Sequence, residues 1–162
     1  MAWYKCSNGN NGDNCASKLE ALEDIYNNNS IIFFDNDERF EVTNNLGAWE
    51  IKNLFTYEGQ NMYSSPQIID GQTSYVDIKN ITSKTLFIRV VYKSSTEGSG
   101  YDYGTISINS VIITTNIGGS VEGVTDVLAL SAGATIRLSY GKDGGASGEL
   151  DNVGMLILEL EE

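Results

Sequence analysis

The sequence predicts an all-β protein, a jelly-roll-like antiparallel β-sandwich of about eight to ten strands with one short N-terminal helix. Two observations lead to this prediction. Residues 84–110 and 132–161 each combine an alternating apolar strand, a polar glycine-bearing turn and a second alternating strand. From Ile31 onward, short alternating segments recur at regular spacing, separated by Asn and Gly residues. We therefore expect residues 1–30 to form an N-terminal anchor segment with the helix, and residues 31–162 to form one β-sandwich domain.

The N-terminal segment opens with two large aromatic side chains, Trp3 and Tyr4, followed by an Asn- and Gly-rich stretch over residues 7–12. This composition is typical of a flexible linker. Two aromatic side chains ahead of a linker can dock on a partner or on a neighbouring subunit. We expect Trp3 and Tyr4 to bind such a partner, and a disordered tail is the alternative.

The short helix is predicted over residues 13–26, where Ser17 followed by Glu20 matches a capping box. A narrow apolar stripe runs along the same segment and consists of Cys15, Leu19, Leu22 and Tyr26. So short a helix is not stable in isolation. We expect the stripe to pack between copies of the chain in a homo-oligomer, with a trimer favoured. Packing of the helix on its own sandwich is the alternative.

The remaining chain alternates between strands and turns. The expected strands cover residues 30–35, 39–43, 49–57, 74–82, 86–92, 103–108, 110–115, 123–130, 135–140 and 153–160. The single proline, Pro66, falls between two of these segments, where it removes no ladder hydrogen bond. No strand–helix–strand alternation and no glycine-rich phosphate loop interrupt the pattern.

Composition restricts the function. The chain of 162 residues has a formal net charge of −12 and contains no histidine. An acidic surface repels phosphate groups, so we expect no nucleic-acid binding and no membrane insertion or docking. Without histidine, Ser-His-Asp and Cys-His catalysis are excluded. We expect a protein that is not an enzyme, and carboxylate-pair chemistry on a glycan is the remaining enzymatic alternative.

The N-terminal residues also indicate the cellular compartment in which the chain is made. Cys6 and Cys15 are expected to be reduced thiols, with a disulfide as the alternative. Residues 1–13 contain no apolar run of the length that a signal peptide needs. We therefore expect synthesis in a host cytoplasm without an export signal.

Four carboxylates fall in the loops between paired strands: Glu97, Asp102, Asp143 and Asp151. Oxygen ligands from loops are what Ca²⁺ requires, so these residues form a candidate calcium site. The alternative is that they cap turns or form solvated pairs. No other cofactor is expected.

Aromatic side chains form the second group of candidate binding residues, because Tyr and Trp rings stack on sugars and dominate protein interfaces. We assign a candidate ligand-binding role to Trp49, Tyr101 and Tyr140, with Trp49 as an exposed platform. Tyr101 and Tyr103 share strand parity and are expected to point inward together. Burial in the core is the alternative for all of these rings.

The two C-terminal loop regions, residues 92–109 and 133–157, resemble a β-sandwich module of bacterial and phage surface proteins. The positions that carry this likeness are Glu97, Tyr101, Asp102, Tyr140, Gly141, Lys142, Asp143, Gly148 and Asp151. Glu149 and Leu150 precede Asp151, a shift from the pattern of that module. The resemblance implies a jelly-roll binding or adhesion domain, in some members with a structural Ca²⁺. The N-terminal layout is also similar to small structural proteins of Gram-positive phages.

These observations favour a phage virion structural component, a head or tail decoration or fibre-type protein located in the virion. Its expected partners are copies of itself, other virion proteins and host-surface glycans. The first alternative is a carbohydrate-binding or adhesin module of a bacterium. The second alternative is a glycan-active enzyme, which would need two carboxylates across a cleft at about 5–10 Å.

Overall fold

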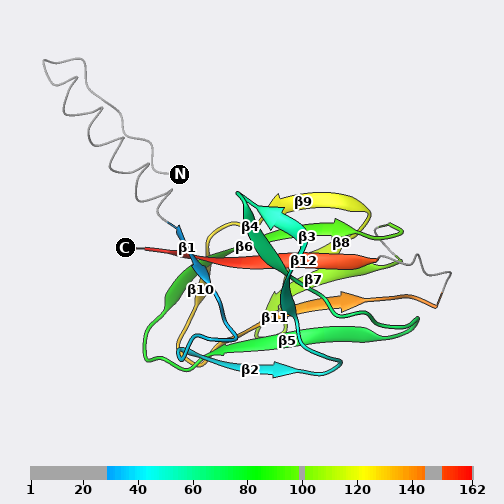
Figure 1. The fold of residues 1–162 in the computed structure, drawn as a ribbon. Helices are drawn as coiled ribbons and strands as arrows, with labels where there is room; N and C mark the ends of the chain where they lie inside the picture. The colour runs from blue at the N-terminus through cyan, green and yellow to red at the C-terminus, as the bar shows by residue number, and fades with distance from the viewer. Residues whose placement is uncertain (1–28, 99–100, 145–150, 162) are drawn as a thin grey trace, which may run out of the picture.

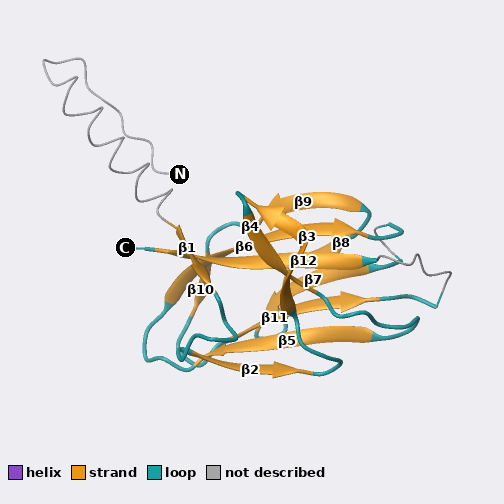
Figure 2. Ribbon diagram, viewed as in Figure 1, coloured by secondary structure: helices purple, strands orange, loops and turns teal. Residues whose placement is uncertain are grey.

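The computed structural model describes residues 29–98, 101–144 and 151–161, which form two antiparallel β-sheets packed face to face (Figures 1 and 2). This arrangement confirms the predicted all-β antiparallel sandwich. The predicted helix lies outside the described residues, together with its partner-binding candidates Trp3, Tyr4, Leu19, Leu22 and Tyr26. Within the described part, no helix is long and apolar enough to cross a membrane.

The first sheet, called sheet A, has seven strands, of which five follow the order β10-β6-β12-β4-β3, while β1 pairs with β12 and β9 pairs with β6. Its strands are β1 (Asn29–Ile32), β3 (Glu50–Tyr57), β4 (Gln60–Ser64), β6 (Leu86–Ser95), β9 (Ser120–Val124), β10 (Leu128–Leu130) and β12 (Asn152–Leu160). The second sheet, sheet B, has five strands in the order β2-β5-β11-β7-β8. These are β2 (Phe40–Asn44), β5 (Thr73–Asn80), β7 (Tyr103–Ile108), β8 (Val111–Ile117) and β11 (Thr135–Gly141).

Every predicted strand has a counterpart, but two details differ. Strand β4 was not predicted as a strand, and the segment 123–130 is divided between β9 and β10. The division occurs at Thr125, whose backbone N–H donates to the Val90 carbonyl at 2.9 Å and whose Oγ1 accepts from the Val90 N–H at 3.0 Å. Because a side-chain oxygen replaces a backbone carbonyl there, the ladder with β6 is interrupted.

Strand β12 is the centre of sheet A, because it pairs with β1, β4 and β6. Residues 152–158 of this strand are all buried, so both faces of β12 are covered. The sequence Val153–Leu158 is correspondingly apolar at consecutive positions, as a strand with two buried faces requires. In Figure 1 this strand crosses the middle of the molecule in red.

Sheet B has one buried and one exposed face. Along β11, Ile136, Leu138 and Tyr140 are buried, whereas the residues between them are exposed or half-buried. Strand β5 alternates in the same way, with Val76 and Ile78 turned toward the core. The core therefore lies between the sheets, and sheet B keeps one free face.

A charged contact joins the edge of sheet B to the centre of sheet A. Arg39, which precedes β2, donates Nη1 to Glu159 Oε1 at 2.9 Å and Nη2 to Glu159 Oε2 at 2.8 Å. The same guanidinium donates to Asp37, which fixes its orientation. The two sheets are thereby linked by a bidentate pair as well as by apolar packing.

Gly154 allows the second face of β12 to be covered. A Cβ added at Gly154 would lie 2.5 Å from Phe55 Cδ2 and 3.0 Å from Phe55 Cβ. Phe55 lies within the register shift between Lys52 and Thr56 of β3. The irregularity of β3 thus lets an aromatic ring lie directly over the backbone of β12.

We expect Gly154→Ala to lower the free energy of unfolding by about 2 kcal/mol, because Phe55 Cβ cannot be displaced by a side-chain rotation alone. Urea denaturation would measure the change. Gly144→Ala is the matched control, since a Cβ there meets no atom within 4 Å. Equal stability of the two variants would contradict the close packing of Phe55 on β12.

Candidate functional site

The free face of sheet B consists of polar and aromatic side chains in rows. Residues on β5, β11 and β7 that are paired across the sheet project on the same side. The rows are Thr73, Gly141 and Tyr103, then Tyr75, Ser139 and Thr105, then Asp77, Arg137 and Ser107. The central three strands therefore present hydroxyls, two tyrosines and one ion pair to solvent.

Two hollows lie on this face. The Tyr101 hollow has a volume of about 380 Å³ and is lined by Thr73, Tyr101, Tyr103, Thr105, Ser139, Gly141, Lys142 and Asp143. The Arg137 hollow has a volume of about 500 Å³ and is lined by Asp77, Ser107, Asn109, Ser110, Ile112, Thr135 and Arg137. Both are lined by β11, where Thr135 and Gly141 are separated by roughly 20 Å at about 3.3 Å per residue. The two hollows share no lining residue and lie one after the other along β11.

Arg137 lines the second of these hollows, and its guanidinium is held in place by two neighbouring residues. Its Nε donates to Asp77 Oδ1 at 2.7 Å and its Nη2 donates to Asp77 Oδ2 at 2.8 Å. Its guanidinium carbon lies 3.8 Å from the centroid of the Tyr75 ring. The hydrogen bond to Asp77 raises the pKa of Arg137, so the guanidinium stays protonated. The result is a fixed set of donors and acceptors with no net charge.

The hydroxyls of the face are also ordered by contacts. Thr105 Oγ1 lies 2.9 Å from Thr115 Oγ1, which couples β7 to β8. Ser139 Oγ donates to the Thr105 carbonyl at 3.3 Å. A hydroxyl both donates and accepts, so such a surface matches ligands that carry hydroxyls of their own.

Tyr101 stands at the rim of its hollow with 59% of its surface exposed. Its backbone N–H donates to the Gly98 carbonyl at 3.3 Å, shortly before β7 begins. The expectation that Tyr101 and Tyr103 point inward is wrong. Tyr103 shares the outward parity of Thr105, while the buried positions of β7 are Gly104 and Ile106.

The two other aromatic candidates are buried, so the expectation that they present accessible rings is wrong. Trp49 is 2% exposed, and its Nε1 donates to Ser74 Oγ at 3.2 Å. Ser74 points inward from β5, which draws the indole into the core. Tyr140 is fully buried, and burial raises the pKa of its hydroxyl. Within the described residues that hydroxyl has no hydrogen-bond partner.

The structure brings together three of the four predicted loop residues, Asp102, Asp143 and Asp151, and Asp143 also lines the Tyr101 hollow. Asp102 and Asp151 are buried and hydrogen-bonded to each other, and the Asp143 backbone N–H donates to Asp102 Oδ1 at 3.1 Å. Glu97 is exposed. The described residues contain no group of three acidic, Cys or His side chains arranged to hold a metal. Calcium binding stays a prediction.

Lys142, which the sequence analysis did not assign to this cluster, supplies a positive charge. Its Nζ lies 3.7 Å from Asp151 Oδ2, and both side chains are more than nine-tenths buried. Burial raises the pKa of Asp102, and the hydrogen bond that its protonated carboxyl donates to Asp151 adds to this effect, whereas the Asp143 N–H opposes it. The cluster joins Lys142 and Asp143, which follow β11 and line the Tyr101 hollow, to Asp151, which precedes β12.

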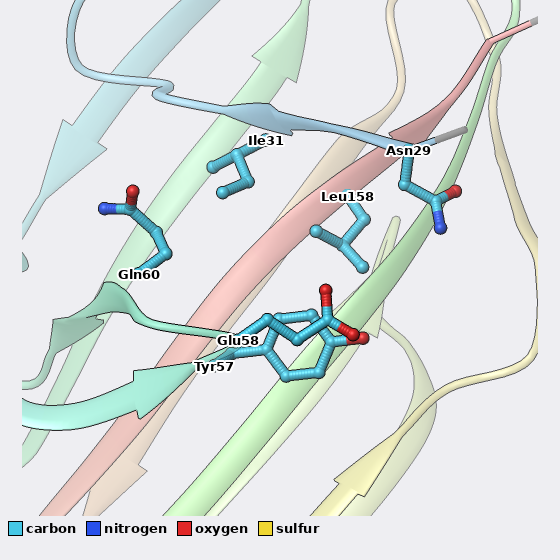
Figure 3. Close-up of a pocket in the computed structure, with 6 residues that line it drawn as sticks. All are labelled: Asn29, Ile31, Tyr57, Glu58, Gln60 and Leu158. Atoms are coloured by element: carbon cyan, nitrogen blue, oxygen red, sulfur yellow. The ribbon is translucent and has the colours of Figure 1, made fainter. Parts of the chain in front are cut away.

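A third hollow, the Tyr57 hollow, lies on sheet A and has a volume of about 310 Å³. Figure 3 shows its lining residues, Asn29, Ile31, Tyr57, Glu58, Gln60 and Leu158. Burial raises the pKa of Tyr57, and the neighbouring Glu58 carboxylate acts in the same direction. Asn29 is the first described residue, so this hollow borders the point at which the described chain begins.

No protein-family model and no curated protein matches the chain. Among solved structures, the secreted serine protease VesC from Vibrio cholerae is similar with a TM-score of 0.62 and 15% identity. The similarity covers 78% of this chain and 25% of the protease, so the chain spans about a quarter of that protein's length. The likeness shows the fold alone.

Two further solved structures have lower scores. CBM29_1, a family 29 carbohydrate-binding module from Piromyces equi, has a TM-score of 0.38 and 10% identity, covering 82% of this chain and 86% of the module. A chain of infectious bursal disease virus, Gt strain, has a TM-score of 0.31 and 17% identity, covering 76% and 32% respectively. The predicted phage origin has no support from sequence families and stays a prediction.

We expect Lys142→Met to lower the free energy of unfolding by about 3 kcal/mol near neutral pH, because two buried carboxyl groups lose their cation. Asp102 has a folded pKa above 3.8, so its contribution to stability is full below that value and is lost as the pH rises through the folded pKa. A protonated Asp102 carboxyl needs no neighbouring cation, so the loss of unfolding free energy caused by Lys142→Met should shrink toward about pH 4. Thermal melts across pH would measure it, and a deficit independent of pH would contradict this assignment.

Proposed function

We propose that the protein is a non-catalytic glycan-binding β-sandwich whose binding surface is the free face of sheet B. The observation that carries this proposal is the pair of adjacent hollows along β11, lined by hydroxyls and tyrosines. Binding sites are concave and combine ring surfaces with a few fixed polar groups. The surface between Thr73 and Arg137 has this character.

The chemistry of the face fits sugars. A sugar ring offers an apolar face for stacking and several hydroxyls for hydrogen bonds. Tyr101 offers an exposed ring in the first hollow, and the fixed Arg137–Asp77 pair offers donors and acceptors in the second. Because Asp77 neutralises Arg137, nothing in this pair favours an anionic ligand over a neutral one.

A binding role is favoured over glycan cleavage. Cleavage needs two carboxyl groups on opposite sides of the scissile bond. Asp102 and Asp151 are hydrogen-bonded to each other. Asp151 also pairs with Lys142, which lines the Tyr101 hollow. Their mutual contacts support a structural role below the surface.

We expect Tyr101→Ala to weaken glycan binding about tenfold, equivalent to about 1.4 kcal/mol, because the variant loses its stacking surface. The ligand would be the strongest one found on an array of neutral and anionic glycans, and titration calorimetry would give the affinity. Phe87→Ala is the control, since Phe87 is 42% exposed on β6 of sheet A. An array without any bound glycan, or equal affinities of the two variants, would contradict the proposal.

We further propose that the protein displays this surface on a phage virion. The support is the N-terminal sequence, in which Trp3 and Tyr4 precede an Asn- and Gly-rich stretch, together with the resemblance of the loop regions to phage and bacterial surface modules. The alternative is a bacterial adhesin module, which would use the same binding face on a bacterium rather than on a virion. The N-terminal residues lie outside the described part of the chain.

Deletion of residues 1–13 should leave a folded sandwich that is no longer incorporated into particles, because the anchoring side chains are removed. Immunoblotting of purified particles would measure incorporation, and circular dichroism would verify folding. A double variant, Trp3→Ala with Tyr4→Ala, keeps the length of the segment and should behave like the deletion. Normal incorporation of either protein would refute the anchor while leaving glycan binding open to its own test.

A further inference from the structure

Strand β8 exposes apolar side chains at the edge of sheet B. Val111 is 66% exposed, Ile112 is 62% exposed and Ile113 is 37% exposed. Among the described strands, β8 pairs only with β7, so one side of its backbone faces away from the sheet. Edge strands are usually protected by charged side chains or proline, and β8 carries neither.

The charge pattern around β8 differs from that of the rest of the chain. Residues 103–121 contain no Asp, Glu, Lys or Arg, the longest such stretch in a protein of net charge −12. The stretch includes β7, β8 and the beginning of β9. An uncharged hairpin at a sheet edge, in an otherwise strongly acidic chain, leaves one region of the surface where self-repulsion is lowest.

We propose that β8 is the interface between two copies of this chain, related by a two-fold axis. In such an interface the same patch of both copies meets, so any net charge in the patch would oppose association. Val111, Ile112 and Ile113 are apolar and uncharged, and they satisfy this condition. A charged partner would find no opposite charge in residues 103–121.

The contact is made by side chains rather than by a long continuous ladder. The pairing of β7 with β8 shifts register between Gly104 and Ile106 and again between Ile106 and Ser107. Such irregularities bend an edge strand and shorten the run available for pairing. Val111 and Ile112 precede these irregularities, Ile113 lies at the first of them along β8, and the three β-branched side chains supply the apolar surface.

The interface would adjoin the free face of sheet B. Ile112 lines the Arg137 hollow, so the two copies of this hollow would lie on either side of the axis. Two binding faces held together raise the effective concentration of the second binding event on a surface with repeated ligands. The interface itself does not depend on what the hollows bind.

The test is the molar mass of the full chain in solution, measured by sedimentation equilibrium over a dilution series. We expect the unmodified protein to be a dimer or a larger even-numbered assembly. Ile112→Asp should halve the mass, because the axis would place two buried carboxylates close together. Val111→Asp should do the same, and thermal melting of each variant would verify that it is folded.

Ile69→Asp is the matched control, because Ile69 is 70% exposed in the loop before β5. This variant should keep the mass of the unmodified protein. A monomeric or odd-numbered unmodified protein would overturn the proposal. So would an unchanged mass of the folded β8 variants, or dissociation by Leu22→Asp alone, which would place the subunit contact in the N-terminal segment.

Discussion

The fold depends on the burial of both faces of β12. A strand that is apolar at consecutive positions must be covered on both faces, and β12 packs one face against sheet B, where Val153 and Met155 approach Gly104. The irregular β3 brings Phe55 over Gly154 and covers the remaining side. Arg39 then connects the edge of sheet B to Glu159 near the end of the same strand. The position of each sheet is thus defined relative to one central strand.

The two sheets differ in their outer faces. Both faces of β12 in sheet A are covered, whereas the strands of sheet B bury only one face and expose the other. Its strict alternation turns Ile136, Leu138 and Tyr140 inward and leaves Arg137 and Ser139 outside. The same alternation in β5 and β7 aligns the outer side chains into rows across the sheet. The candidate site is therefore a consequence of strand periodicity, and only its Tyr101 rim and the loop cluster of Lys142 depend on loop conformation.

The alternating strands were predictable because period-two patterns are local, whereas several side-chain directions were not assigned correctly. Tyr140 shares parity with Ile136 and Leu138, and Tyr103 shares parity with Thr105, so the sequence contained the signals for burial and exposure. Trp49 lies just before β3 begins, so strand alternation does not predict whether its side chain points inward or outward. The pairing of Lys142 with Asp151 brings together the two ends of the connection between β11 and β12, which no local pattern encodes. Strand β4 is short and buries three consecutive residues, so it lacks an alternating pattern.

Electrostatics explains why the two proposed contact surfaces share one sheet. A chain of net charge −12 repels copies of itself and anionic ligands, so surfaces that make contacts need to be locally neutral. On sheet B, Asp77 neutralises Arg137, and the β7–β8 hairpin carries no charge. Contacts made there rest on hydroxyls, aromatic rings and apolar side chains, which salt screens little. In the assembly that we propose, the excess of carboxylates elsewhere would keep other faces apart and would favour association through this side of the molecule.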